Sequence, residues 1–179
     1  MAAQTPQTDD ELGGYAVAVV RDENSWTVTP LDAEVLTSLA AAEAALKDLR
    51  VAGASFGILD VDDEFFVIVR TGPAGTSLLI SDATAAIAYD LAEDVLDALN
   101  VDVPDIDQDE LDDIDPWEEG DLSILSDLGL GDQELGAILA DLDLYPEEQI
   151  ARIAERLSFD TQLAAVLDKL GVGQGDDGR

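Results

Sequence analysis

The sequence contains no cysteine and no histidine. Without cysteine there can be no disulfide bonds and no thiolate metal sites. Without histidine the chain lacks the commonest general base and the commonest metal ligand of proteins. Most catalytic sites are built from these side chains. The sequence therefore predicts a protein that is not an enzyme and that holds no metal or cofactor.

Positive charge is also scarce. The 179 residues include 8 Lys+Arg against 41 Asp+Glu, which gives a formal net charge of -33. A field of this sign repels nucleic-acid phosphates and anionic membranes, and it attracts basic surfaces. The composition therefore predicts a basic protein as partner, with no direct binding to nucleic acid or membrane. No pattern in the sequence points to a small-molecule substrate.

Long apolar runs are absent as well. No run approaches the ~20 residues that span a bilayer, and residues 1–14 lack the apolar core of a secretion signal. We therefore expect a cytoplasmic protein. Salt-adapted proteins also carry large negative charge. This leaves open a self-contained acidic adaptor or structural protein whose charge reflects salt adaptation or solubility.

The hydrophobic pattern predicts an α+β fold. It indicates an antiparallel five-stranded sheet with two helices, followed by a small all-helical C-terminal region. The predicted segments are a disordered N-terminus at 1–14, an α+β domain at 15–100, an acidic linker or arm at 101–120, a bundle of short helices at 121–170 and a disordered tail at 171–179.

Turn and cap residues predict where the elements of the α+β domain begin and end. Thr29 and Pro30 are typical of a helix start, and Gly53 of its end. The apolar stripe expected on this helix is Val35, Leu39, Ala42, Leu46 and Leu49. Asp62-Asp63 predicts a tight hairpin between two strands. A second helix is expected from Ser81-Asp82 to Asn100.

Four short helices are expected after the acidic segment. The first covers residues 121–128, and Asp132 is expected to cap the second. Pro146 opens the third, and Asp160 is expected to cap the last. Helices this short are unstable alone, so they must bury their apolar stripes against one another or against the preceding domain.

The acidic segment is the one feature that points to a function. Residues 101–121 contain eleven acids and no base, and no Lys or Arg occurs between Arg70 and Arg152. One interpretation is a solvated spacer between two domains. The other is an arm that docks on a basic protein, with Trp117 as an aromatic anchor and acids that steer association. The candidate partner-binding residues are Asp109, Glu110, Asp112, Asp113, Asp115, Trp117, Glu118 and Glu119.

Two local motifs lack residues or elements that their function requires. Residues 53–57 match the G-x-S-x-G pattern of a hydrolase elbow, but a helix is expected before Ser55 and a strand after it, and there is no histidine. Those glycines are better explained by a helix end and close packing. Residues 105–109 resemble the start of a calcium loop, but Glu110 replaces the required glycine and Pro116 the bidentate glutamate.

Several segments together resemble the tRNA adenosine deaminase-associated proteins. They are DDEFFVIVR at 62–70, ISDA at 80–83 with AA at 85–86, DL at 121–122, Leu125, DLG at 127–129 and IAERL at 153–157. They cover about residues 15–170 in the order of that family. The resemblance implies an accessory protein associated with a tRNA adenosine deaminase or another basic tRNA-acting protein. It implies no catalytic residues. The chain is not the deaminase, because that enzyme type binds zinc through histidine and cysteine.

Overall fold

The computed structural model describes residues 13–23, 25–49 and 53–170. The two ends that the sequence predicts as disordered lie outside this part of the chain, apart from Gly13 and Gly14. Gly14 already begins the first strand.

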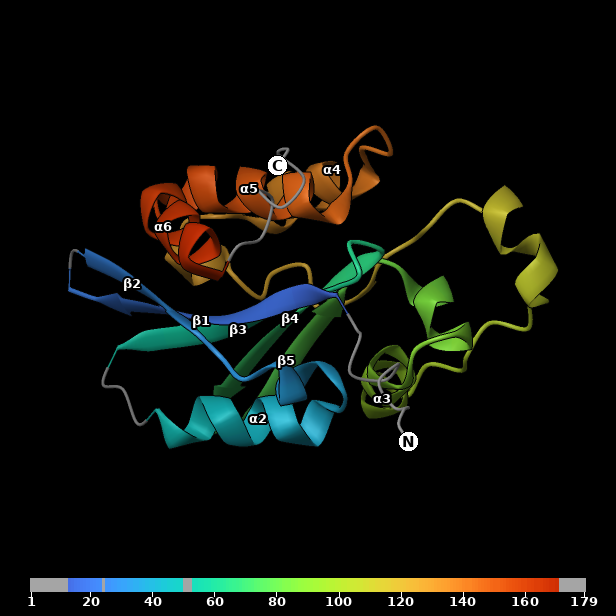
Figure 1. Ribbon diagram of the computed structural model, residues 1–179, viewed down its shortest axis with the longest axis horizontal. Helices are drawn as coiled ribbons and strands as arrows, with labels where there is room; N and C mark the ends of the chain where they lie inside the picture. The colour runs from blue at the N-terminus through green and yellow to red at the C-terminus, as the bar shows by residue number, and fades with distance from the viewer. Residues whose placement is uncertain (1–12, 24, 50–52, 171–179) are drawn as a thin grey trace, which may run out of the picture.

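The centre of the fold is an antiparallel sheet of six strands (Figure 1). The strands are β1 (Gly14–Asp22), β2 (Ser25–Pro30), β3 (Ala54–Val61), β4 (Phe65–Gly72), β5 (Gly75–Ile80) and β6 (Glu119–Gly120). Their spatial order is β2-β1-β3-β4-β5-β6, and all neighbours are antiparallel. The α+β class and the antiparallel pairing are confirmed. The predicted count of five strands is wrong, because β6 has two residues and is too short to show a periodic pattern.

The β3–β4 hairpin turns at Asp62 and Asp63, as predicted. Their φ angles are 55° and 57°. Positive φ at both central residues is the geometry of a type I′ turn, whose twist matches that of the flanking strands. Aspartate tolerates this left-handed conformation better than most residues. Local turn chemistry therefore sets the register of the two central strands.

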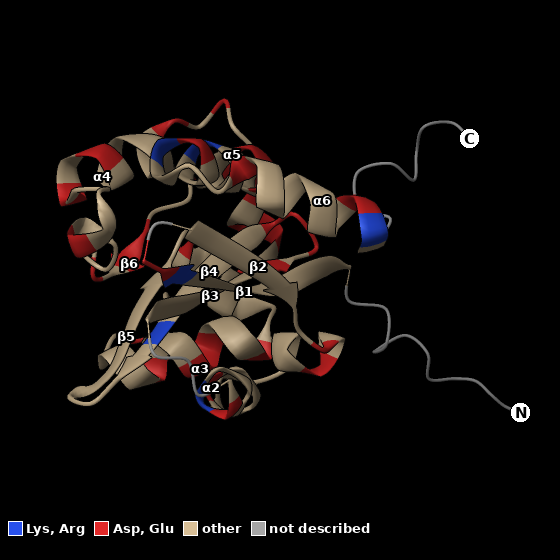
Figure 2. Ribbon diagram, turned by 90° about the vertical axis from the view of Figure 1, so that its left-hand side faces the viewer, with Lys and Arg blue, Asp and Glu red and all other residues tan. Residues whose placement is uncertain are grey.

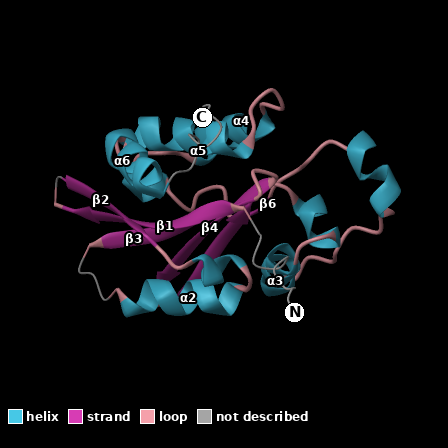
Figure 3. Ribbon diagram, viewed as in Figure 1, coloured by secondary structure: helices cyan, strands magenta, loops and turns pink. Residues whose placement is uncertain are grey.

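One face of the sheet is covered by helices that precede the acidic arm (Figure 3). They are the 3-10 helices η1 (Ala33–Leu36) and η2 (Ala83–Ile87) and the α-helices α2 (Leu39–Asp48) and α3 (Asp90–Leu99). The stripe predicted from Val35 to Leu49 packs into this core, with Leu49 partly buried. The buried face of this helix was predicted correctly, but the residues at which it begins and ends were not.

The first predicted helix start on this face, at Thr29 and Pro30, is wrong, whereas the second, at Ser81-Asp82, is confirmed. β2 continues through Pro30, and α2 begins after Ser38, whose hydroxyl accepts a 3.1 Å hydrogen bond from the Ala41 amide. It ends at Asp48, before Gly53. The predicted second helix is split into η2, which Asp82 caps, and α3, which Asn100 ends in the left-handed conformation. In each case a 3-10 helix precedes the α-helix. The spacing of apolar residues is similar in both, so the sequence pattern does not show where one ends and the other begins.

The opposite face is covered by the C-terminal helices. They are η4 (Ser126–Leu128), α4 (Asp132–Ala140), α5 (Pro146–Leu157) and α6 (Asp160–Leu170). Phe159, between α5 and α6, is fully buried, with its ring 5.3 Å from that of Trp26 and 6.0 Å from that of Phe56. The C-terminal helices and the sheet therefore share one hydrophobic core.

Three details of the C-terminal prediction are wrong. The helix expected over 121–128 is a series of turns that ends in η4. Gly131, and not Asp132, occupies the cap position of α4, and Asp160 is the first residue of α6. The start of α5 at Pro146 is confirmed. An aspartate favours both the cap and the first turn of a helix, so the sequence does not separate the two positions.

The acidic arm, residues 101–120, links the two helical layers, and its last two residues form β6. It contains the 3-10 helix η3 (Gln108–Asp113), in which no residue is buried. Figure 1 shows η3 standing away from the rest of the molecule. The chain then returns to the sheet edge as β6 and crosses to the face covered by α4–α6. The division into separate domains at 15–100 and 121–170 stays a prediction.

We predict that Phe159→Ala weakens the whole fold and not only the C-terminal helices. Truncating a buried phenylalanine costs roughly 3–5 kcal/mol, and here the lost contacts join α5 and α6 to β2 and β3. Urea unfolding should be followed by circular dichroism and by Trp26 fluorescence in a Trp117→Phe background. The two signals should shift together. Two separate transitions would contradict this and favour independent domains. Leu170→Ala, at an exposed position, is the control.

Candidate functional site

The residues predicted to bind a partner are mostly solvent-exposed. The exposed members are Asp109, Glu110, Asp112, Asp113, Asp115 and Trp117. Glu118 and Glu119 are half-buried, because the chain joins the sheet there. The five exposed acids lie on η3 and the segment after it, so this part of the arm presents charge without packing against the sheet.

Trp117 is held at its backbone and exposed at its side chain. Its carbonyl accepts a 2.8 Å hydrogen bond from the Ala83 amide, next to the start of η2. Its indole Nε1 donates to Glu119 Oε2 at 3.2 Å, and the residue is 38% exposed. Trp117 thus lies outside the two buried cores, in a position fixed by main-chain bonding.

Segments far apart in the sequence meet at the Asp62-Asp63 turn, which we call the hairpin end of the sheet. The Glu147 amide, in the first turn of α5, donates to Asp63 Oδ1 at 2.9 Å. The Tyr89 hydroxyl donates to Asp62 Oδ2 at 2.9 Å. The segment after β5 lies beside the start of β4, because the Ser81 amide donates to the Phe66 carbonyl. The Trp117 carbonyl accepts its hydrogen bond from Ala83, two residues after Ser81, so Trp117 lies at the hairpin end too.

A second feature of the hairpin end is a buried carboxyl group. Asp60 is 2% exposed, and its Oδ1 accepts a 3.0 Å hydrogen bond from the Asp63 amide. Burial, with a smaller contribution from the Asp63 charge, raises the pKa of Asp60 to about 7. The neighbouring Tyr15 hydroxyl is buried and has no hydrogen-bond partner among the described residues. Burial also raises the pKa of Tyr15. Sequence reasoning missed this pair, because Asp60 is one acid among 41.

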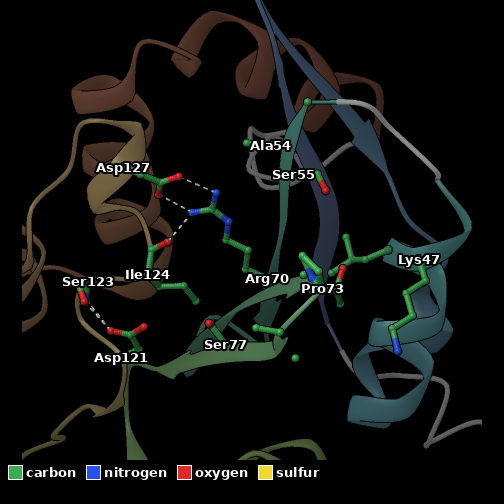
Figure 4. Close-up of a pocket in the computed structure, with 16 residues that line it drawn as sticks. Lys47, Ala54, Ser55, Arg70, Pro73, Ser77, Asp121, Ser123, Ile124 and Asp127 are labelled. Atoms are coloured by element: carbon green, nitrogen blue, oxygen red, sulfur yellow. Dashed lines mark hydrogen bonds and ion pairs between the residues drawn. The ribbon is translucent and has the colours of Figure 1, made fainter.

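The opposite end of the sheet contains a cleft of about 640 Å³ (Figure 4). It opens where the two central strands separate. The β3–β4 ladder ends at the pair Gly57–Val69, whereas β4 and β5 stay paired as far as Gly72 and Gly75.

Arg70 closes one wall of this cleft. Its Nη1 donates to the Ile124 carbonyl at 2.8 Å, and its two terminal nitrogens donate to the two carboxylate oxygens of Asp127 at 2.7 and 2.9 Å. These bonds lower the pKa of Asp127. Because the guanidinium is engaged on both nitrogens, Arg70 ties the segment before α4 to the sheet and is not positioned as a substrate ligand.

Two serines that line the cleft, Ser123 and Ser55, lie in settings unlike that of a catalytic serine. Ser123 Oγ donates to Asp121 Oδ1 at 2.7 Å, and the same oxygen accepts from the Ser123 amide, which is the pattern of a local turn. Ser55 of the G-x-S-x-G pattern lies inside β3, so a strand and not a helix follows it. A Cβ on Gly53 would lie 2.0 Å from the Arg21 carbonyl oxygen, which confirms that close packing requires this glycine.

The described part of the chain contains neither a cluster of metal-ligating side chains nor a helix that could span a membrane. Within residues 13–23, 25–49 and 53–170, no group of three or more acids is placed to hold a metal ion. The stretch that resembles a calcium loop continues into η3 instead. None of the described helices has the length and apolar content needed to cross a bilayer.

We predict that Asp60 makes the folded state less stable as pH rises from about 4 to above 7. The folded state holds this proton more tightly than the unfolded state, whose pKa is near the ordinary value of 3.8. Asp60 therefore favours folding most below pH 4, and that contribution is lost as the folded group ionises. Asp60→Asn should remove this dependence and stabilise the protein at pH 8 by up to roughly 4 kcal/mol.

Urea unfolding of the wild type and of Asp60→Asn at pH 5 and pH 8 measures the effect. Asparagine keeps the acceptor for the Asp63 amide. Asp97→Asn, at an exposed acid of α3, removes the same charge without the burial and is the control. Parallel pH profiles for wild type and Asp60→Asn would contradict the prediction.

Comparison with known proteins identifies the family of this chain. Residues 14–160 match the model of the family described as Rv3753c-like tRNA adenosine deaminase-associated protein. The matched segment runs from the start of β1 to the start of α6 and includes the arm. The chain is 55% identical over 170 residues to Protein Rv3753c of Mycobacterium tuberculosis (strain ATCC 25618 / H37Rv), covering 95% of this chain and 93% of that protein. No solved structure matches. The chain therefore belongs to the family of Rv3753c-like tRNA adenosine deaminase-associated proteins.

Proposed function

We propose that this protein is a non-catalytic accessory protein of the cytoplasm, where tRNA is modified, and that it binds a tRNA adenosine deaminase or another basic protein that acts on tRNA. The family description supports a deaminase as the associated protein. The observation that carries the proposal is the acidic arm: η3 and the segment after it expose five acids, with no base between Arg70 and Arg152.

Electrostatics favours this class of partner. An enzyme that binds tRNA must present Lys and Arg to phosphate groups. The arm carries the opposite charge and extends away from the sheet, so it can reach such a surface without rearranging the fold. Direct binding of tRNA by this chain is disfavoured, because a net charge of -33 repels the phosphates.

The distribution of charge separates this proposal from the alternative of salt adaptation or solubility. Figure 2 shows Asp and Glu on the outer surfaces of both helical layers, with few Lys and Arg. Acidity spread over the surface in this way fits both a basic partner and salt adaptation or solubility. An exposed tryptophan fixed beside an acidic arm favours a protein partner, because tryptophan is enriched among interface residues that contribute most to binding.

We predict that amide substitutions on the arm slow association with the deaminase. The variant changes Asp109, Glu110, Asp112, Asp113 and Asp115 to amides and spares Glu119, which bonds to Trp117. Electrostatically steered complexes associate at ~10⁸ M⁻¹s⁻¹ or faster in low salt and slow down as ions screen the charges. Stopped-flow measurements should show association at least about tenfold slower at low salt, with a flatter salt dependence.

A matched control removes five other exposed acids. They are Asp22, Asp32, Glu34, Asp48 and Asp97. The net charge changes equally in both variants, so a difference between them measures the position of the charge. Equal effects would favour general acidity over an arm-specific site. If purified protein and deaminase fail to bind even at low ionic strength, the proposed function is wrong.

We predict that Trp117→Ala acts mainly on dissociation. The indole is partly exposed in the free protein, so its loss should leave the unfolding midpoint nearly unchanged. An aromatic anchor buried in a complex should raise the dissociation rate about tenfold or more when it is truncated. Trp117→Phe, which keeps the apolar ring, is the control. An unchanged dissociation rate for Trp117→Ala would remove this residue from the binding surface.

A further inference from the structure

The turn between α4 and α5 exposes two large apolar side chains. Leu142 is 51% exposed and Tyr145 is 68% exposed. Tyr145 is the most exposed of the large hydrophobic residues described in the chain. It occupies the cap position of α5, directly before Pro146. Neither residue belongs to the core on this side of the sheet.

Three local hydrogen bonds, donated by backbone amides of the turn, hold it in one conformation. The Leu144 amide donates to the Asp141 carbonyl at 3.2 Å, and the Asp143 amide donates to Asp141 Oδ1 at 3.1 Å. The Tyr145 amide donates to Glu148 Oε1 at 2.9 Å. The two exposed side chains therefore stand on a turn that is already ordered, and binding through them need not order this backbone.

This turn lies at the same end of the sheet as Trp117. The connection runs through α5, whose second residue donates from its amide to Asp63 in the β3–β4 turn. Trp117 is bonded at Ala83, beside the segment that pairs with the start of β4. Figure 1 places the α4–α5 turn and the arm on the same side of the molecule. The hairpin end thus carries apolar groups on two separate segments.

The surroundings of both apolar segments are acidic. The acids of the β3–β4 turn are Asp62, Asp63 and Glu64. Those of the α4–α5 turn and the start of α5 are Asp141, Asp143, Glu147 and Glu148. The stretch from Thr71 to Ala151, which includes both the arm and the α4–α5 turn, contains no Lys or Arg. A surface of exposed leucine, tyrosine and tryptophan surrounded by one sign of charge is complementary to an apolar patch with a basic rim.

We propose that Leu142 and Tyr145 form a second anchor, which acts with Trp117 to seat the basic surface of one protein partner across the hairpin end. The inference rests on the proposed function and extends it from a single arm to a two-point surface. The partner is a folded protein with a basic rim and two apolar contact points. The arm supplies attraction at a distance, and the two anchors supply the contacts that hold the complex together.

The test is a double variant, Leu142→Ser with Tyr145→Ser, measured against purified tRNA adenosine deaminase by surface-immobilised kinetics. Serine is a preferred helix cap, so the start of α5 should be retained. Charge is unchanged, so the association rate should stay within about twofold of wild type. The dissociation rate should rise about tenfold, and about a hundredfold when Trp117→Ala is added, since well-separated sites act additively.

The matched control is Leu170→Ser, at the end of α6. Leu170 is 45% exposed, and its helix packs on β2, at the far edge of the sheet from β6. It should bind like wild type. If wild type binds and Trp117→Ala weakens the complex while the double variant matches wild type, the second anchor is wrong and the proposed function stands.

Two other outcomes would also reject the second anchor. If wild type does not bind at low salt, the proposed function fails, and this inference fails with it. If the double variant abolishes a self-dimer in sedimentation and leaves deaminase binding unchanged, the turn is an interface between copies of this chain.

Discussion

The whole structure depends on burying both faces of one sheet. β1, β3 and β4 carry runs of buried residues on successive positions, so neither face can be left in water. Helices that precede the acidic arm cover one face, and α4–α6 must cover the other. Phe159 is the point at which this second cover meets the sheet, through Trp26 and Phe56.

The arm follows from the same constraint. The chain has to pass from the layer of α3 to the layer of α4, and it does so around the outer edge of the sheet, where β6 pairs with β5. Arg70 then fastens the crossing segment through the Ile124 carbonyl and Asp127. Between α3 and β6, Val101 packs against the core but the residues of η3 are not buried, so this segment can carry many uncompensated charges in solvent.

Local patterns predicted the presence and type of helices and strands better than the residues at which they begin and end. The alternation and length of the apolar runs indicated five strands, and a tight hairpin at Asp62 and Asp63 was expected from residue type, where the structure shows positive φ at both residues. The helix limits near Pro30 and in residues 121–128 were wrong. A 3-10 turn and an α-helix bury residues at similar spacings, and caps tolerate several residues, so neither signal separates them. The strand β6 has no local signal at all.

The sequence by itself excludes disulfides and sites built from cysteine or histidine, because the chain contains neither residue, and its net charge of -33 predicts a basic partner. It also located the acidic arm, since eleven acids and no base within residues 101–121 are too costly to bury in a core. Only the tertiary structure decided that Asp60 is buried and that Tyr145 shares an end of the sheet with Trp117. These facts depend on pairings between residues up to 84 positions apart, which no local pattern encodes.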